Sequence, residues 1–422
     1  MNEPYPSPVW HPFTQHGIEP QALSVRSAEG AWLEAHDGTR LFDAISSWWV
    51  ITHGHRHPKI VRAIQEQAEK LDQVVFAGFT HDPAEVVARA LIDVAPDGLS
   101  HVFFSDSGST SVEVALKMAL GYWRHRGEVR SRILALEHAY HGDTVGTMSA
   151  GARGVFNAAY EPLLFDVGRI PSPSEGHAQA TFDALDAACR QGDVAAFICE
   201  PLILGAGGML IYDAATLAEM HRICAAHSVL FIADEVMTGF GRTGTMFACN
   251  QANITPDIMC LAKGLTGGSL PLAATLCKLE IFQAHLSKDR ARMFFHSSSY
   301  TANPIACAAA AANLDIWRNE PVAQRVAALS QFQSGARARI SGDDRFENAR
   351  QIGTIMAFDV AHVPGGYLAD IALALRSRCL AAGVLIRPLG ATVYVMPPYC
   401  TTEAELTRVY DVICEVTSEV CP

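Results

Sequence analysis

Lysine is scarce in this chain, and one lysine stands where a reactive amine is expected. Six of the 422 residues are lysines, and Lys263 is the one that directly follows an apolar run, residues 258–262, and precedes a glycine. A side chain at the end of a buried strand is partly desolvated, which lowers the pKa of an amine and makes it a competent Schiff-base nucleophile. Taken alone, a strand-end lysine that simply reaches solvent is the commoner arrangement.

Two further features fit the same chemistry. Asp234 closes another apolar run, residues 229–233, and a buried acid requires a cationic partner. Residues 107–110 read Ser-Gly-Ser-Thr before a helix-like segment, and such a turn offers N–H groups and a helix dipole to a phosphate, although an ordinary N-cap has the same composition. Pyridoxal 5′-phosphate needs a lysine, an acid for its ring nitrogen and a phosphate cradle. Tyr140 could stack on its ring or be a core aromatic.

Two other patterns are typical of different chemistry, and their neighbours argue against both. Residues 239–244 match G-x-G-x-x-G, but the dinucleotide-binding pattern has to open a helix and residues 245–248 give no helix start. Residues 53–57 carry three alternating histidines, as metal ligands on one strand face do. A glycine and a proline there indicate a loop or strand end, and no cysteine or carboxylate cluster lies alongside. We expect no metal site.

The candidate residues stand at the ends of short apolar runs that alternate with helix-like stretches. Ligands bind outside the carboxyl ends of strands in an open parallel sheet. Runs that are apolar on both faces are typical of such strands covered by helices. A large α/β domain is therefore predicted from about residue 55 to 310. The apolar runs are residues 102–104, 133–136, 195–199, 229–233 and 258–262, with a helix expected at 214–227.

The two ends of the chain show a different pattern. Residues 31–43 predict a hairpin. We predict that residues 1–54 together with 311–422 form a smaller α+β domain. Its other expected elements are a charged helix after about residue 315, strands near 354–360 and 393–396, and a last helix from Thr402.

Composition argues against several classes of protein. Acidic residues outnumber basic ones by 44 to 32, the formal net charge is −12 and no basic block occurs, so we expect no nucleic-acid partner. No apolar run reaches the roughly 18 residues of a membrane span, and the Pro-rich N-terminus has no signal-peptide pattern. The 11 cysteines form no C-x-x-C pair and mostly stand in apolar runs. This favours buried, reduced thiols in a cytoplasmic protein.

Several stretches together resemble the class III aminotransferases of the fold type I pyridoxal-phosphate superfamily. The likeness runs from Trp10 to about Pro398, and within the class it is strongest to enzymes of biotin synthesis that convert 8-amino-7-oxononanoate to 7,8-diaminononanoate. It implies a mostly parallel central sheet covered by helices and a smaller α+β domain. The marks that carry it are Trp10-His11-Pro12-Phe13-Thr14, Ser46-Ser47-Trp48-Trp49, Asp106-Ser107-Gly108-Ser109, Tyr140-His141-Gly142-Asp143-Thr144, Gly205-Ala206-Gly207-Gly208-Met209, Asp234-Glu235 through Gly244, Lys263-Gly264-Leu265-Thr266-Gly267-Gly268, Arg387-Pro388 and Tyr394-Val395-Met396-Pro397-Pro398-Tyr399.

The resemblance implies a role for each matching position around the cofactor. Lys263 would carry pyridoxal phosphate as a Schiff base and move the proton during the transfer. Asp234 would pair with the ring nitrogen, and Tyr140 would stack on the ring. Gly108 and Ser109 would hold the phosphate.

The resemblance also implies a homodimer in which a phosphate contact crosses the interface. Ser299 would make that contact in place of the threonine found in many members. Leu204 stands where many members carry a glutamine near the cofactor oxygen, so that hydrogen bond is lost or supplied by another group.

For the substrate, the resemblance implies a pocket walled by Trp48 and Trp49. Adjacent tryptophans on a strand would point to opposite faces, so one core does not easily bury both. Arg387 would bind the distal carboxylate through its bidentate fork, with a surface or interdomain ion pair as the alternative. The remaining substrate-binding positions are Phe13, Arg242 and Tyr394.

The amino donor is open at this point. Phe13 stands where some of these enzymes have a tyrosine that touches the substrate. Most of them use S-adenosylmethionine, and some relatives use lysine. We therefore expect a two-step amino transfer to 8-amino-7-oxononanoate. The alternatives are a class III aminotransferase for another amine or ω-amino acid and, more remotely, a nicotinamide dehydrogenase.

Overall fold

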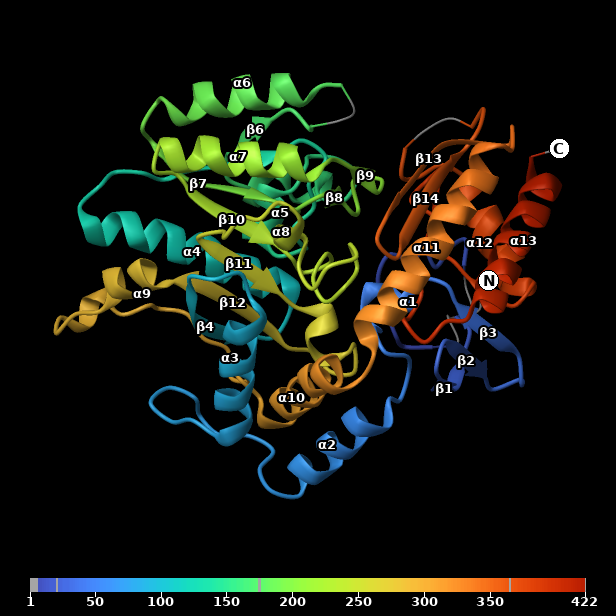
Figure 1. The fold of residues 1–422 in the computed structure, drawn as a ribbon, viewed down its shortest axis with the longest axis horizontal. Coiled ribbons are helices and arrows are strands. Elements are labelled where there is room, and N and C mark those ends of the chain that lie inside the picture. The colour runs from blue at the N-terminus through green and yellow to red at the C-terminus, as the bar shows by residue number, and fades with distance from the viewer. Residues whose placement is uncertain (1–6, 20–21, 174–175, 364–365, 422) are drawn as a thin grey trace.

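A seven-stranded sheet forms the centre of the larger part of the molecule (Figure 1). The structure is a computed structural model that describes residues 7–19, 22–173, 176–363 and 366–421. All strands of this sheet are parallel except β12, which is antiparallel to both of its neighbours. In spatial order they are β4 (Leu99–Ser105), β12 (Ala273–Lys278), β11 (Ile258–Leu261), β10 (Leu230–Asp234), β7 (Val194–Cys199), β5 (Arg132–Leu136) and β6 (Gly168–Ile170).

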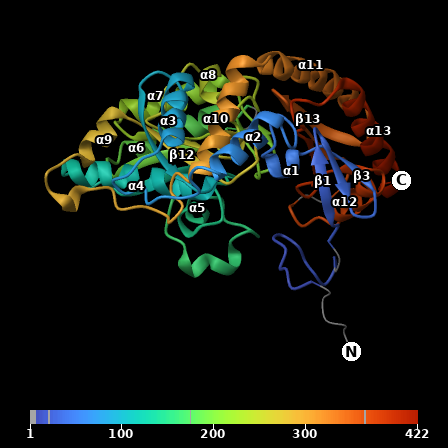
Figure 2. The same ribbon diagram turned by 90° about the horizontal axis from the view of Figure 1, so that it is seen from below.

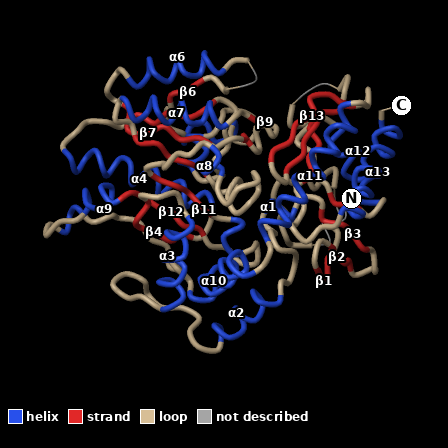
Figure 3. The backbone as a smooth tube through the Cα atoms, viewed as in Figure 1, coloured by secondary structure: helices blue, strands red, loops and turns tan. Residues whose placement is uncertain are grey.

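The middle strands are buried along their whole length because helices cover both faces of the sheet (Figure 3). Side chains of successive strand residues point to opposite faces, so Phe197 packs into one core and Ile198 into the other. The first core includes α3 (Asp82–Val94), α6 (Ala178–Cys189), α7 (Ala214–Ala226) and α10 (Pro304–Asn319). The second includes α4 (Gly108–Arg126), α5 (Val145–Ala150) and α9 (Leu279–His285).

This sheet confirms the predicted fold class. Each of the five apolar runs lies within or overlaps a strand, and α7 is the helix expected at 214–227. The strands β6 and β12 were not predicted. β6 has only 3 residues, and β12 contains a single β-branched residue, Thr275, so neither carries a strong strand signal.

Strands from both ends of the chain lie side by side in the smaller part of the molecule (Figure 1). The predicted hairpin is β2 (Trp32–Ala35) and β3 (Arg40–Asp43), which β1 (Val25–Glu29) and β15 (Val384–Leu385) extend to four strands. Phe42 of β3 is the partner of Val384 of β15, and both side chains belong to one core. That core also packs the remaining elements of this part: β13 (Phe346–Ile352), β14 (Ile355–Val360), β16 (Thr392–Val395), α11 (Val322–Ser341), α12 (Ile371–Ala381) and α13 (Glu403–Val420).

The division of the chain into two domains stays a prediction. The helix α10 runs through the expected boundary at residue 310 without a break. Across the described ranges, no helix is both long and apolar enough to cross a membrane. All 11 cysteines are free thiols, and nine of them are buried.

The tryptophan pair does not lie on a strand, so the strand geometry used to argue about it was wrong, although only Trp49 of the two is buried. Trp48 and Trp49 belong to α1 (Ser46–Trp49), a single irregular turn whose backbone is non-helical at Ser47 and Trp48. The other connecting elements are α2 (Pro58–Ala68), η1 (Ala158–Leu163), β8 (Ile203–Leu204), β9 (Leu210–Ile211), α8 (Ala248–Gln251), η2 (Lys263–Thr266) and η3 (Arg290–Arg292).

Candidate active site

The carboxyl ends of the parallel strands meet around a cavity of about 440 Å³. The segments that follow β4, β5, β7, β10 and β11 all contribute to it, as expected for an open α/β sheet. The structure thus brings together the polar residues predicted at these strand ends. They include Ser107, Gly108, Ser109, Tyr140, Asp234 and Lys263.

Lys263 begins the turn η2, and only Ala262 separates it from the end of β11. Its φ is 43°, a strained value for a residue with a side chain, as is often found at functional sites. Burial lowers the pKa of its amine, since the charged form is poorly solvated there. Nζ lies 5.0 Å from the ring centroid of Trp49, and no ion pair to Nζ occurs among the described residues. A buried, unpaired amine of lowered pKa is suited to act as a nucleophile.

Asp234 ends β10 and is oriented by a histidine. Its Oδ2 lies 2.7 Å from His141 Nδ1, and its Oδ1 accepts the N–H of Val236 at 3.1 Å. His141 Nε2 is buried without a hydrogen-bond partner among the described residues. A buried carboxylate oriented in this way can hold a cationic ring nitrogen. His141 was not among the predicted site residues, although it directly follows Tyr140 in the segment after β5.

The N-terminus of α4 forms a cradle next to these residues. Ser107 caps the helix: its hydroxyl accepts the Thr110 N–H at 3.2 Å, and Thr110 Oγ1 accepts the Ser107 N–H at 2.9 Å. At Gly108 a Cβ would lie 2.6 Å from Val236, and at Gly142, whose φ is 128°, a Cβ would collide with Ser109 Oγ. Only glycine permits this close approach. Free N–H groups at the start of a 19-residue helix suit a phosphate.

The backbone of Tyr140 is held by Glu200, which directly follows β7. Glu200 accepts the Tyr140 N–H and the Gly205 N–H, both at 2.9 Å. Burial raises the pKa of Glu200 to about 7. Burial also raises the pKa of the Tyr140 hydroxyl above its ordinary value, so that hydroxyl stays protonated at neutral pH.

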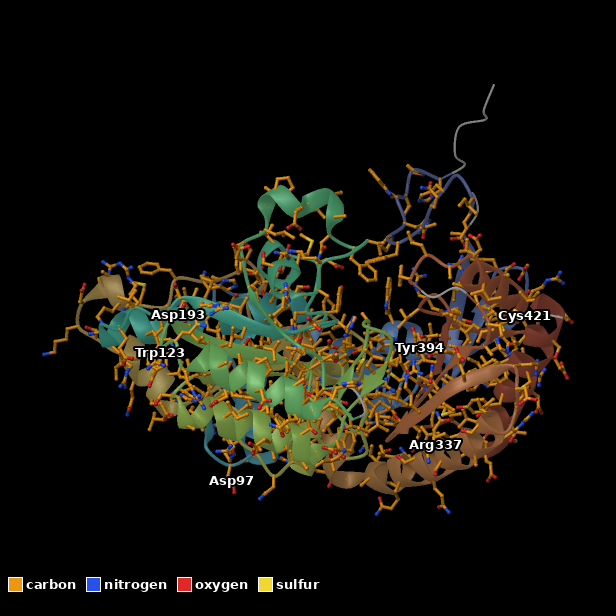
Figure 4. The ribbon with its side chains drawn as sticks, turned by 90° about the horizontal axis from the view of Figure 1, so that it is seen from above. Asp97, Trp123, Asp193, Arg337, Tyr394 and Cys421 are labelled. Carbon is orange, nitrogen blue, oxygen red and sulfur yellow. The ribbon has the colours of Figure 1, made fainter. Side chains whose placement is uncertain are left out.

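A second cavity of about 320 Å³ adjoins the first, and Trp49, Tyr140 and Lys263 line both. Its walls are mostly aromatic and come from both parts of the molecule. Figure 4 shows Tyr394 where the two parts meet. The segment around η1 and the N-terminal segment project on the same side (Figure 2). The other lining residues are Pro12, Phe13, Trp48, Asp143, Phe156, Ala206, Tyr367, Arg387, Leu389 and Tyr394.

Arg387 lies against the aromatic wall of this second cavity. Its guanidinium carbon is 4.7 Å from the ring centroid of Trp48, and Nη2 donates to the carbonyl oxygen of Phe13 at 3.1 Å. The rings of Phe13 and Trp48 meet edge-on at 5.5 Å. Tyr394 accepts the indole N–H of Trp49 at 2.9 Å. A cavity of this kind suits a long apolar ligand that ends in a carboxylate.

The structure places Arg242 and Ser299 outside both cavities. Arg242 was expected among the substrate-binding residues, but its guanidinium is fully buried and donates to the carbonyls of Trp49, Ile51 and Pro397. It therefore supports the backbone of the site. Ser299 lies in an exposed loop and does not line the cavities of its own chain.

The two discounted patterns have structural explanations. Residues 239–244 form turns that end before α8 begins at Ala248, so the glycine pattern does not open a helix. This argues against the dehydrogenase interpretation. His53 lies 2.8 Å from Asn313 and His55 lies 2.9 Å from Asp43, which gives each imidazole a protein partner.

The sequence and the fold match one family of proteins. The family model described as Aminotransferase class-III covers residues 13–416. A relative from Synechococcus elongatus, named adenosylmethionine-8-amino-7-oxononanoate aminotransferase, is 46% identical over 98% of this chain and 99% of its own length.

Two solved structures are similar along the whole chain. The adenosylmethionine-8-amino-7-oxononanoate aminotransferase from Methanocaldococcus jannaschii has a TM-score of 0.94 at 32% identity and covers 98% of this chain and 97% of its own. An amine transaminase from an uncultivated Pseudomonas species, in its PLP-bound form, has a TM-score of 0.90 at 30% identity and covers 99% of each chain.

Proposed function

This chain belongs to the class III aminotransferases, which are pyridoxal-phosphate enzymes, and on that premise we propose that its amino acceptor is 8-amino-7-oxononanoate. The relatives named for that reaction match nearly the whole chain. The observation that carries the proposal is the second cavity, whose mostly aromatic lining includes both Arg387 and Lys263. Such a cavity fits an aliphatic keto acid with its ketone near the lysine.

The residues of the first cavity fit the cofactor. Pyridoxal phosphate supplies a carbon that takes up and releases the amino group, and a ring that accepts electrons. The N-terminus of α4, with Gly108 and Ser109, offers N–H groups to the phosphate. Asp234, oriented by His141, would hold the proton on the ring nitrogen, and the amine of Lys263 would bind the aldehyde.

Lys263 would also move the proton that amino transfer requires. Because burial lowers the pKa of this amine, a larger fraction is unprotonated near neutral pH than for an exposed lysine. Nζ can therefore take a proton from the carbon that bears the amino group and return it later. Tyr140, whose hydroxyl stays protonated, can donate a hydrogen bond at the border of the two cavities.

The second cavity would bind the substrate chain and its carboxylate. Removing the methylene groups of the acid from water is favourable by about 0.8 kcal/mol for each fully buried group. Arg387 uses one N–H on the Phe13 carbonyl and retains others for a carboxylate. Its stacking on Trp48 keeps the planar group in place while it binds.

The variant Arg387→Ala is expected to weaken binding of the acceptor. Because the carboxylate loses its bidentate partner, KM for 8-amino-7-oxononanoate should rise by about 10- to 100-fold, and kcat should change much less. The measurement is steady-state kinetics with the acceptor varied at saturating donor. Arg387→Lys keeps the positive charge but not the bidentate guanidinium, so its KM should lie between those of the wild type and Arg387→Ala. An unchanged KM in Arg387→Ala would remove this residue from the carboxylate site.

We propose S-adenosylmethionine as the amino donor, with lysine as the second candidate. Phe13 keeps an aromatic wall in the second cavity but offers no hydroxyl to a donor. Purified enzyme should form 7,8-diaminononanoate, detected by mass spectrometry, with S-adenosylmethionine as the sole donor. Product formed with lysine but not with S-adenosylmethionine would make lysine the donor. No product with either donor, together with turnover of another amine or ω-amino acid, would overturn the proposed acceptor.

We further propose that the enzyme is a homodimer. Ser299 lies next to exposed apolar side chains, including Phe295 and Tyr300, each 64% exposed. Gln73 donates to the Ser299 carbonyl at 2.6 Å and so joins this loop to the segment that carries the exposed Phe79. A second copy would cover these side chains and bring its own Ser299 toward the cavity. Light scattering should give twice the 45.5 kDa of one chain, and a single-chain mass for active enzyme would contradict the proposal.

A further inference from the structure

The tryptophan pair is carried by a turn whose backbone is unusual. Ser46, Ser47 and Trp49 have φ values of 52°, 60° and 66°, so three of the four residues of α1 are left-handed. That region is unfavourable for any residue with a Cβ, and it is rare for a bulky one. Such a turn persists only where its surroundings hold it.

Asp43, the last residue of β3, holds the start of this turn. Its carboxylate is fully buried and accepts the Ser47 N–H at 2.8 and 2.7 Å, the Ser47 hydroxyl at 3.1 Å and the Ile45 N–H at 3.4 Å. His55 Nε2 lies 2.9 Å from the same carboxylate. Within the described ranges no lysine or arginine forms an ion pair with Asp43. Its hydrogen-bonding capacity is therefore used on the turn and on His55.

The end of the turn is held by a buried group of opposite charge. Arg242 donates to the carbonyl of Trp49 at 3.3 Å and to that of Ile51 at 2.8 Å. A carboxylate therefore accepts N–H groups at the start of the turn, and a guanidinium donates to the carbonyl of its last residue and to that of Ile51 just beyond it. Charged groups make the stronger hydrogen bonds to backbone, and they do so most effectively where water is excluded.

This turn sets what each tryptophan contacts. The Trp48 ring carries Arg387 at 4.7 Å. The Trp49 ring lies 5.0 Å from Lys263 Nζ, and its indole N–H is bonded to Tyr394. A relaxed turn would move both rings, because they are neighbours on one short segment.

We propose that Asp43 is a positioning residue for the aminotransferase reaction. Its carboxylate holds the 46–49 turn in its strained conformation, which directs Trp48 toward Arg387 and Trp49 toward Lys263. Asp43 lines neither cavity, so it acts through the turn. The proposal rests on the proposed function for the identity of the substrate, but not for the placement of the tryptophans.

The test compares Asp43→Ala and Asp43→Asn with Trp49→Phe, using near-ultraviolet circular dichroism and kinetics. Asp43→Ala should lose the dichroism component that Trp49→Phe loses, because the indole leaves its fixed environment. KM for 8-amino-7-oxononanoate should rise by about 10-fold, with a smaller change in kcat. Asp43→Asn keeps one acceptor oxygen, so its dichroism and its KM should lie between wild type and Asp43→Ala.

A combined variant separates positioning from general stability. In a Trp48→Ala/Trp49→Ala background, where neither ring is left to be positioned, Asp43→Ala should raise KM by less than about 2-fold, because residues that act through one another are not additive. The matched control is Asp257→Asn. Asp257 accepts the Phe231 N–H at 2.7 Å and pairs with Lys278 at the opposite end of the sheet, so dichroism and KM should stay at wild-type values.

Wild-type dichroism and KM in Asp43→Ala, or the full single-variant effect on KM in the Trp48→Ala/Trp49→Ala background, would overturn the proposal. Should Asp43→Ala not fold, Asp43→Asn decides: a partial loss of both signals supports the proposal, and wild-type values overturn it. The dichroism needs no substrate. If the wild-type enzyme is inactive on 8-amino-7-oxononanoate, the proposed function is overturned, and the dichroism still tests whether Asp43 positions the tryptophans.

Discussion

Lys263→Ala is expected to abolish turnover and the visible absorption band of the bound cofactor together. Lys263 is the only lysine among the described residues that line either cavity. Its loss removes both the nucleophile for the aldehyde and the proton carrier, so the rate should fall by on the order of 10⁴-fold or more. Borohydride reduction of the wild-type enzyme should bleach the band, and peptide mapping should find the label on Lys263.

Lys278→Ala is the control for that result. Lys278 ends β12 and pairs with Asp257 at 2.7 Å, on the side of the sheet away from the cavity, so this variant should keep the band and the activity. A visible Schiff-base band in Lys263→Ala, or a reduced label on another lysine of the wild-type enzyme, would contradict the assignment.

Asp234→Asn is expected to have the second-largest effect. The amide keeps the shape of the side chain but not the negative charge, so the proton on the cofactor ring nitrogen loses its partner and the ring accepts electrons less well. We expect kcat to fall by about 10²- to 10³-fold, with weaker retention of the cofactor. Both are measured on enzyme reconstituted with excess pyridoxal phosphate, by steady-state kinetics and by cofactor content after gel filtration.

Asp213→Asn provides a matched aspartate in the same part of the molecule. Asp213 caps α7 by accepting the Thr216 N–H at 2.7 Å, and it lines neither cavity. Its substitution should lower stability by at most about 1 kcal/mol without changing kcat. A wild-type kcat in Asp234→Asn would show that the ring nitrogen does not depend on this carboxylate.

The core of the site was predictable because it depends on a local pattern. Asp234 is the last residue of one apolar strand, Lys263 follows another after Ala262, and Gly108 and Ser109 begin a helix after a third strand. The carboxyl ends of parallel strands share one edge of a sheet, so residues at these ends lie close together regardless of the conformation of the loops between them. The structure places all four around one cavity. Their individual roles stay predictions until the variants are measured.

Other features were not predictable because they depend on contacts between distant segments. Arg242 looked like a substrate ligand, yet its partners include the Pro397 carbonyl, 155 residues away. For Trp48 and Trp49 a strand was considered, since nothing in the local sequence shows that the Asp43 carboxylate would hold a left-handed turn there. Phe156 and Tyr367, whose rings are 4.5 Å apart in the second cavity, come from loops in different parts of the chain.

The central claim is that the enzyme itself carries an amino group from the donor to 8-amino-7-oxononanoate. Its most direct test is a single turnover. Holoenzyme is incubated with S-adenosylmethionine that carries an isotopic label in its amino group, the donor is removed by gel filtration, and the acceptor is then added alone. We expect labelled 7,8-diaminononanoate in an amount equal to the active sites, with return of the original visible band. Enzyme that has taken up the labelled amino group but passes none of it to the acceptor would show that 8-amino-7-oxononanoate is not the amino acceptor.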